Sequence, residues 1–405
     1  MQTTSPPGQL RRGELLALLS MTIALGALSI DLMLPGFGEI RAAFGMPPDS
    51  SATAGIVTAY MVGLSIAQIF YGPFSDRFGR KPVLAVGFAL YALGATASAL
   101  APTFGWLLAG RVLWGMGAAG PRVLSISIIR DTHEGDRMAR TMSFIMAVFI
   151  LVPVFAPSVG AAILAFAPWR ALFWFCVGYV ALIALWAVRL PETLPPDRRI
   201  ELRFDGIRRA ARTVLRNRAT MGHALALMLM FAALLTYLGT SELIVDDVFG
   251  LADRFPLIFG GLAALMGSAV LGNASIVERF GARRIARWSL IGFAAGGTAL
   301  AALALATGGR PGFWPFIVLL APTLACYSLT GPNLNTLAMD PMREVAGTAA
   351  AVIGTMQTGG GALIAAIVDG AYDGTVVPFT VGVLGAGLGA LAAFAWADRA
   401  AGAGR

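Results

Sequence analysis

Long apolar runs separated by short polar connections occupy most of the chain. A helix needs about 20 apolar residues to cross the ~30 Å hydrocarbon layer of a bilayer. Twelve runs reach that length, at roughly 14–38, 52–75, 81–100, 103–128, 139–166, 168–190, 219–245, 254–277, 284–306, 312–338, 344–369 and 375–397. The pattern predicts an all-α membrane protein with twelve transmembrane helices.

The longest polar segment divides these runs into six and six. It predicts two six-helix halves, 1–190 and 219–405, joined by a linker at 191–218. Apolar residues recur at helical spacing within the linker and alternate with arginines, which is typical of an amphipathic helix. These apolar residues are Ile207, Ala210, Ala211, Val214 and Leu215. Such a helix would lie on the inner leaflet or serve as a solvated linker.

Composition supports the membrane interpretation. Hydrophobic residues make up 57% of the chain and charged residues 13%, against about 25% charged residues in a soluble domain. The 49 glycines suit helices that approach closely in lipid. Cys176 and Cys326 lie inside apolar runs and indicate neither a disulfide nor a metal site. We therefore expect no metal and no cofactor.

The basic residues indicate the orientation in the membrane. The formal net charge is +8, and 24 of the 30 basic residues fall at the chain ends or in every second connection. Cytoplasmic loops carry such an excess of Lys and Arg. We expect both termini in the cytoplasm of a bacterial cell and the chain in the inner membrane. The charge then marks topology and predicts no nucleic-acid partner.

An internal repeat supports the two-half organisation. Residues 76–81 read Asp-Arg-Phe-Gly-Arg-Lys, and residues 278–283, which lie 202 positions later, read Glu-Arg-Phe-Gly-Ala-Arg. Gly120-Pro121 in the fourth run has its counterpart in Gly331-Pro332 in the tenth. Parallel repeats with a binding site between them near the bilayer midplane are a transporter architecture.

Several segments resemble the major facilitator superfamily. The connection at residues 72–82 resembles its cytoplasmic loop signature, which depends here on Gly72, Asp76, Arg77, Gly79, Arg80 and Lys81. Gly79 suits the tight turn, Asp76 could pair with a neighbouring helix end, and Arg77 and Arg80 are expected to face lipid headgroups. The resemblance implies that this cluster steadies one transport state and breaks on switching. A merely topology-setting basic loop is the alternative.

Two further motifs resemble the family, and the second of them is associated with exporters. Residues 111–120 resemble the family motif Arg-x-x-Gln-Gly-x-Gly, with Trp114 in place of the glutamine. Residues 153–160 are similar to the exporter-associated motif through Pro153, Pro157 and Gly160. Prolines and glycines there would bend the helix, or be ordinary kinks and packing positions.

A third motif is similar to the bicyclomycin/chloramphenicol-resistance (Bcr/CflA) branch. It occupies residues 29–35, with Met33 at the usual tyrosine position. Residues 169–170, 192–194 and 346–349 fit the same branch. The resemblance implies a monomer whose partners are lipid, protons and a small-molecule substrate.

Asp31 and Arg111 are ionisable groups inside apolar runs. Such groups cost at least ~2.5 kcal/mol to insert and usually mark function. At 1.5 Å per residue, both lie roughly 10–12 Å below the outer surface. The resemblance makes contact between their helices plausible. We hypothesise that Asp31 carries the coupling proton and that Arg111 tunes it and contacts the cargo. A static ion pair is the alternative.

Other residues are candidates for a substrate cavity. They are Met33, Tyr60, Gln68, Trp114, Arg122, Tyr237, Glu242, Asn333, Asn335 and Gln357. Met33 and Trp114 would provide adaptable apolar contacts. The amides could equally form hydrogen bonds between helices. For Glu242 we favour a solvated residue at the outer mouth.

These observations favour proton-coupled efflux of small amphipathic drugs or metabolites by alternating access. An importer of a small nutrient on the same fold is the main alternative. A membrane-embedded enzyme or a receptor is disfavoured, because no cluster of His, Asp or Ser and no Gly-x-x-x-x-Gly-Lys-Ser/Thr phosphate loop occurs.

Overall fold

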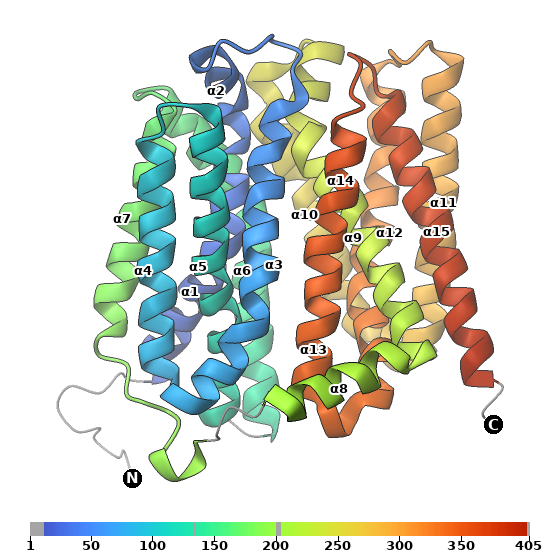
Figure 1. Cartoon of the computed structure of the whole chain (residues 1–405). Helices are drawn as coiled ribbons and strands as arrows, with labels where there is room; N and C mark the ends of the chain where they lie inside the picture. The colour runs from blue at the N-terminus through green and yellow to red at the C-terminus, as the bar shows by residue number, and fades with distance from the viewer. Residues whose placement is uncertain (1–11, 133–134, 200–203, 403–405) are drawn as a thin grey trace. The chain divides into compact units, whose positions relative to one another are not determined.

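The computed structural model describes residues 12–132, 135–199 and 204–402. All regular structure in these residues is helical (Figure 1). Twelve helices among them are long and apolar enough to cross a membrane. The expected twelve-span, all-α fold is therefore confirmed, and the span limits agree with the apolar runs to within a few residues.

The helices follow one another with short connections. They are α1 (Arg12–Asp31), α2 (Phe37–Ala43), α3 (Ala54–Phe78), α4 (Arg80–Ala99), α5 (Phe104–Thr132), α6 (Gly135–Leu164), α7 (Arg170–Ala187), α8 (Phe204–Arg216), α9 (Arg218–Leu243), α10 (Phe255–Phe280), α11 (Ala282–Ala306), α12 (Phe313–Met339), α13 (Ala346–Thr355), α14 (Gly361–Asp369) and α15 (Val377–Gly402). The single turn Leu34–Gly36 carries the first span on from α1 into α2, and the π-helical turn Met356–Gly360 joins α13 to α14.

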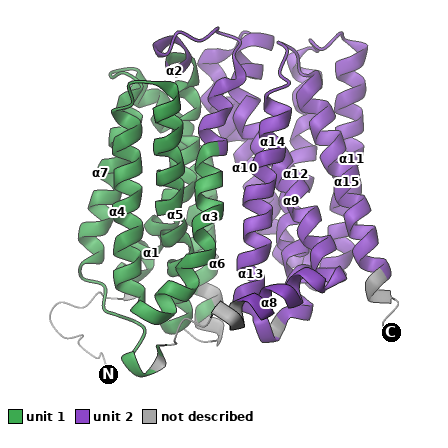
Figure 2. Cartoon of the chain, in the orientation of Figure 1, with its two compact units in different colours: residues 1–39, 59–203 green, residues 40–58, 204–405 purple. Residues whose placement is uncertain are grey.

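The chain forms two compact units, coloured separately in Figure 2. Unit 1 contains residues 1–39 and 59–203, and unit 2 contains residues 40–58 and 204–405. These limits differ from the sequence expectation in two ways. Segment 40–58, which connects the first two spans, packs with unit 2. The helix α8 in the linker also belongs to unit 2.

Glycines allow the helices of unit 1 to pack backbone against backbone. A Cβ added to Gly94 on α4 would lie 2.2 Å from the backbone nitrogen of Trp114, and one on Gly117 of α5 would lie 2.1 Å from that of Tyr91. Gly115 faces α3 in the same manner, with only 1.9 Å to the oxygen of Tyr60. This close packing of α4 on α5 is what the high glycine content predicts for helices in lipid.

Unit 2 is organised around α9. This helix packs against α12, α14 and α15, and most of its residues are buried. The linker helix α8 contacts α9 and α13. Val214 on α8 is fully buried, whereas Leu215 is more than half exposed, so α8 buries only part of its apolar face.

The two halves share one turn geometry. The α3–α4 turn contains Gly79 with φ of +100°, and the α10–α11 turn contains Gly281 with φ of +76°. Residues with a side chain rarely adopt these values. The sequence repeat therefore corresponds to a repeated backbone turn at the same step of each unit.

Candidate functional site

The first span breaks immediately after Asp31. Pro35 has no N–H and cannot donate to the carbonyl of Asp31 four residues earlier. The N–H of Met33 bonds to the oxygen of Ile30 at 3.1 Å instead of to Ser29, its normal helical acceptor. Asp31 is left at the end of α1 and is only 4% exposed.

Arg111 on α5 holds this broken helix end. Its Nη1 donates to the backbone oxygen of Ser29 at 3.0 Å, the oxygen that the break deprives of its helical donor. The guanidinium lies over the rings of Tyr60 and Trp114, with 4.6 Å from Cζ to each ring centre. A cation beside the C-terminal end of a helix also complements the partial negative charge there.

Arg111 contacts the backbone next to Asp31 and not the Asp31 side chain. No ion pair joins the two side chains, both of which the structure describes. The guanidinium is directed at the α1 backbone and at the aromatic rings. A static ion pair between the helices is therefore not what fastens α1 to α5 in this conformation.

Hydrogen bonds connect the same stretch of α1 to two further helices. Ser29 Oγ lies 2.7 Å from the hydroxyl of Tyr91 on α4, and the hydroxyl of Tyr60 on α3 donates to the oxygen of Gly26 at 3.3 Å. Trp114 packs edge-on against Tyr91, with 5.3 Å between ring centres. Tyr60, Trp114 and Met33 are each 0% exposed. These candidates for the cavity are thus core residues that surround the end of α1.

The exporter-like segment of α6 contacts the break from another side. A Cβ at Gly160 would lie 2.3 Å from the oxygen of Leu32 and 3.0 Å from Cγ of Pro35. Only glycine permits this approach. Pro153 and Pro157 lie within α6, about two turns and one turn before Gly160, respectively. The two motifs of residues 29–35 and 153–160 therefore meet at one place, next to Asp31.

The loop signature forms an ionic network within unit 1. Arg80 pairs with Asp76 through Nη1 and with Asp131 at the end of α5 through Nε, at 2.9 Å. Its Nη1 also donates to Ser75 Oγ at 2.7 Å. Arg80 is 3% exposed, so the expectation that it faces headgroups is wrong. Arg77 is exposed, as expected, and lies over the ring of Phe78.

Glu192, after α7, completes this network. Its carboxylate accepts the backbone N–H groups of Arg80 at 2.8 Å and Lys81 at 3.1 Å, the first two residues of α4. A carboxylate at a helix N-terminus satisfies donors that have no partner within the helix. A Cβ on Gly79 would lie 2.5 Å from Glu192 Oε2, so this glycine provides both the turn and the space. Gly72 lies on α3 with open space around its Cα.

Glu242 is buried in an ion pair within unit 2. Its two carboxylate oxygens accept Nη1 and Nη2 of Arg41, each at 2.9 Å. Arg41 Nη1 also donates to Thr53 Oγ1 at 3.2 Å. Glu242 is 7% exposed and Arg41 2% exposed. The preferred interpretation of Glu242 as a solvated mouth residue is therefore wrong.

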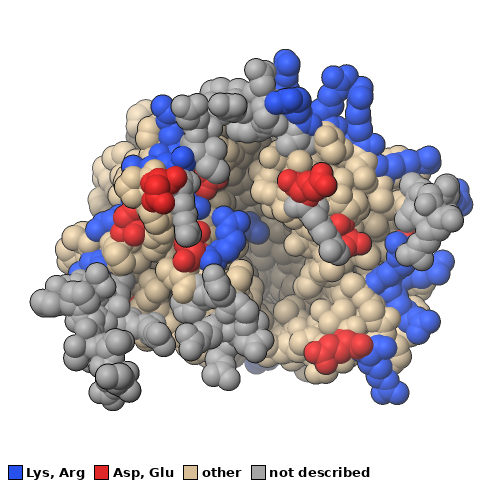
Figure 3. Space-filling model, turned by 90° about the horizontal axis from the view of Figure 1, so that it is seen from below, with Lys and Arg blue, Asp and Glu red and all other residues tan. Residues whose placement is uncertain are grey.

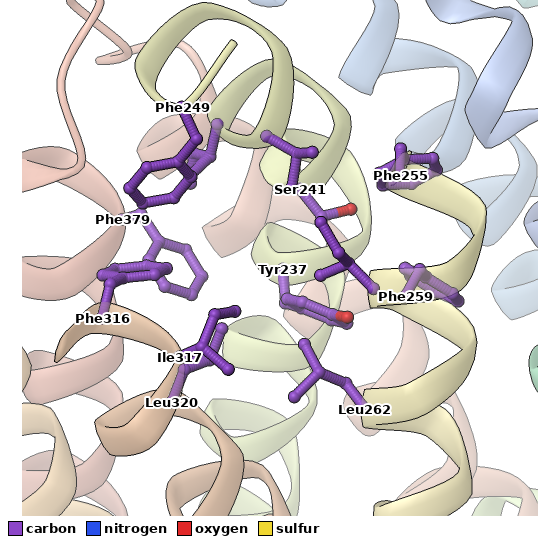
Figure 4. A pocket seen from close by; sticks show the side chains of 13 residues that line it. Tyr237, Ser241, Phe249, Phe255, Phe259, Leu262, Phe316, Ile317, Leu320 and Phe379 are labelled. Atoms are coloured by element: carbon purple, nitrogen blue, oxygen red, sulfur yellow. The ribbon is translucent and has the colours of Figure 1, made fainter. Parts of the chain in front are cut away.

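Tyr237 lines an apolar pocket of unit 2 (Figure 4). Its ring stacks on Phe259 with 5.5 Å between centres and 8° between planes. Phe316 and Leu320 of α12 and Phe379 of α15 form the opposite wall. The cavity volume is about 20 Å³, room for about one water molecule. A drug-sized ligand would require the pocket to open.

The remaining candidates divide by environment. Asn333 donates from Nδ2 to Asn273 Oδ1 at 2.8 Å and is 2% exposed, so it links α12 to α10 rather than lining open space. Gln68 on α3 and Gln357 in the π-helical turn are half-buried, whereas Arg122 and Asn335 are exposed.

A family model decides the identity of the fold. The model described as Major Facilitator Superfamily matches residues 14–365. The chain belongs to the major facilitator superfamily. Members of this superfamily are transporters and not enzymes, which confirms the expectation from the absent catalytic motifs.

Several superfamily relatives align along most of the chain. The MFS-type transporter YdgK of Bacillus subtilis is 32% identical over 389 residues, which cover 92% of each chain. The bicyclomycin resistance protein homolog of Haemophilus influenzae is 30% identical and covers 91% of each chain. The multidrug resistance protein MdtL of Escherichia coli is 32% identical over 55% of each chain.

Solved structures of two other transporters share the fold. A D-xylose-proton symporter has a TM-score of 0.74 at 16% identity and covers 94% of this chain and 96% of its own. The human organic anion transporter MFSD10 has a TM-score of 0.63 at 19% identity, with 97% and 100% coverage. At these identities the likeness concerns the fold alone.

Sequence reasoning missed two carboxylates. Asp131 pairs with Arg80 but reads in the sequence as the solvated end of a span. Asp369 ends α14 and is 3% exposed, and it reads in the same way. The signal in both cases was an acidic residue at or just beyond the end of an apolar run, which does not distinguish a solvated end from a buried one. Among the described residues, no group of three or more His, Cys, Asp or Glu could hold a metal ion.

Proposed function

We propose that the protein exports small amphipathic drugs or metabolites across the bacterial inner membrane in exchange for protons. The observation that carries this proposal is Asp31, a carboxylate buried at the break in the first span and surrounded by motif residues from α5 and α6. The names of the relatives in Haemophilus influenzae and Escherichia coli, which refer to bicyclomycin and multidrug resistance, support the drug-efflux class and the Bcr/CflA branch.

Asp31 would carry the coupling proton. A buried carboxylate is costly to ionise unless cations or hydrogen-bond donors stabilise it, and Arg111 is fastened to the α1 backbone two residues away. Protonation would remove one charge from the helix end and change which conformation is favoured. Because its guanidinium stays charged, Arg111 could also hold an anionic or carbonyl group of the cargo.

We further propose that both chain termini lie in the cytoplasm and that the protein acts as a monomer. Figure 3 looks onto the ends where α3 meets α4 and α10 meets α11, and Lys and Arg side chains are spread over much of that face. This distribution is typical of a cytoplasmic surface. The ionic network of Arg80 would then steady one state of the transport cycle from the cytoplasmic side.

Flux measurements in inverted membrane vesicles test the function. An acidic interior is imposed, chloramphenicol and other amphipathic compounds are added, and compound uptake and interior pH are followed together. We expect uptake accompanied by proton release, and we expect Asp31→Asn to abolish the coupled flux while the protein stays folded. Asp253→Asn, which alters an exposed carboxylate, is the matched control and should transport normally.

The outcomes separate the two transport directions. Full gradient-driven transport by Asp31→Asn would exclude the coupling role. If no compound enters with the gradient, the reversed gradient is applied to the same vesicles with sugars and other nutrients. Flux only under the reversed gradient would show that the protein is an importer and not an exporter.

A further inference from the structure

Asp369 is a buried carboxylate that the proposed transport mechanism does not use. It ends α14 and is 3% exposed. Its Oδ1 is buried and has no hydrogen-bond partner, and its carboxylate interacts with the side chain of Thr236 on α9. An ionised carboxylate in such a place requires a cation or several donors. No ion pair between described residues includes Asp369.

Gly239 on α9 brings Asp369 next to segment 40–58. A Cβ built on Gly239 would lie 2.7 Å from Asp369 Oδ2 and 2.9 Å from Cβ of Ala54. The carboxylate oxygen and the Ala54 methyl therefore lie within 3 Å of the same point. Ala54 directly follows Thr53, which accepts a hydrogen bond from Arg41. The carboxylate thus borders the segment that Arg41 and Glu242 fasten to α9.

Two arginines of the adjoining elements have partners other than Asp369. Arg41 is paired with Glu242 one turn along α9 from Gly239, and Arg310 donates to the oxygen of Gly374 at 3.2 Å. Tyr237, two residues before Gly239 on α9, stacks on Phe259. The connections that follow α9 and α14 contain Asp246, Asp247, Tyr372 and Asp373. Tyr372 donates to Asp247 at 2.8 Å, and Asp373 accepts from Thr375 at 2.6 Å.

Tyr372 does not compete for the proton in the neutral range. Burial, together with the hydrogen bond to Asp247 and the charge of that group, raises the pKa of Tyr372 above its usual value. The neutral acid form of Asp369 fits against the Ala54 methyl, whereas the ionised form would bring an uncompensated charge against it.

We propose that Asp369 is a second proton-binding site, at the end of α14, and that its protonation holds segment 40–58 on unit 2. Loss of the proton places a bare charge between α9 and Ala54. Segment 40–58 is then displaced or admits water, and the Arg41–Glu242 pair remains as its second fastening. The proposal goes beyond the exporter mechanism, because neither Asp31 nor the cargo takes part in it.

Hydrogen–deuterium exchange on the full-length protein in nanodiscs tests the proposal without a transported substrate. Amides of residues 51–58 are followed at about pH 6 and about pH 9, and the rates are corrected for the intrinsic pH dependence of exchange. In the wild type we expect corrected exchange to be about tenfold faster at the higher pH. In Asp369→Asn, which is neutral at every pH, we expect slow exchange at both.

Three further variants complete the test. Glu242→Gln breaks the ion pair and should speed exchange at both pH values, which shows that release is detectable. Asp373→Asn, which changes an exposed carboxylate nearby, should retain the wild-type response. Asp369→Leu is a second uncharged variant in case Asp369→Asn does not fold.

A wild-type pH response that persists in both Asp369 variants, or a wild type without any response, would overturn the proposal. If the addition of Na⁺ alone slows exchange at the higher pH, the site binds a metal cation instead of a proton, and the proposal is overturned. Unchanged exchange in α12 is the check that each variant is folded.

Discussion

Arg111 and Asp31 lie at the same end of α1 but form no ion pair with each other. The guanidinium donates to the oxygen of Ser29 at 3.0 Å, and Asp31 is two residues further along, where α1 ends. Arg111 therefore supplies to α1 the donor that the break has removed. An influence of Arg111 on the carboxylate would therefore act through the position of the α1 backbone.

Replacing Arg111 with lysine should not preserve activity. Lysine keeps the charge but lacks the planar group that lies over the Tyr60 and Trp114 rings and donates in a fixed direction. We expect proton-coupled flux in Arg111→Lys to fall at least about tenfold, which corresponds to ~1.4 kcal/mol. Arg130→Lys, at an exposed position of the same helix, is the comparison. Equal flux in the two variants would contradict a positional role for Arg111.

Adding one methyl group at Gly160 should disturb the break in the first span. The Cβ of Gly160→Ala would lie 2.3 Å from the oxygen of Leu32, so α1 or α6 must move. Overpacking of this kind costs about 1–3 kcal/mol, and we expect a lower melting temperature together with strongly reduced flux. Gly178→Ala on α7 has no atom within 4 Å of the new Cβ and should change neither. Wild-type behaviour of Gly160→Ala would mean that the contact is not needed.

The two repeated turns should respond differently to loss of an arginine. Arg80→Ala leaves Asp76 and Asp131 without their buried cation, and removal of one partner from a buried pair costs about 3 kcal/mol. Arg283→Ala removes a half-exposed side chain that lies 3.4 Å from Asp398, and its cost should stay below about 1 kcal/mol. Chemical denaturation of both variants measures the difference. Similar losses would show that the network adds nothing specific to unit 1.

Asn333 should matter for stability and not for substrate affinity. Its bond to Asn273 is a hydrogen bond between helices, a type that contributes about 0.6–1.7 kcal/mol in membrane proteins. We expect Asn333→Ala and Asn273→Ala to destabilise the fold non-additively in a double-mutant cycle, with KM for transport unchanged. A raised KM in Asn333→Ala alone would return Asn333 to the substrate cavity.

The fold can be predicted well from the sequence, because a lipid environment permits few backbone structures. Twelve runs of suitable length must become twelve helices, since backbone polar groups in hydrocarbon need internal partners. The turn at Gly79 and its repeat at Gly281 were also readable, because only glycine tolerates their φ values. These features depend only on the local sequence and on the lipid that surrounds the helices.

The site was only partly predictable because its partners come from distant parts of the chain. Apolar periodicity cannot reveal that Arg111 bonds to a backbone oxygen freed by Pro35, or that Glu192 lies over the first turn of α4, 111 residues or more away. Glu242 is similar. Its partner Arg41 lies 201 residues earlier, in a connection that reads as solvated.

The shared turn of the two units suggests how they have diverged. Gly79 and Gly281 both keep a positive φ, yet Arg80 of the first turn corresponds to Ala282 in the second, and the ion pairs with Asp76 and Asp131 have no equivalent through that position. If an ancestral six-helix gene was duplicated, selection has preserved the backbone of both copies and the salt-bridge hub of one. Homologous positions in the two halves should therefore tolerate variation unequally, and an inhibitor directed at the Arg80 hub would act on one half only.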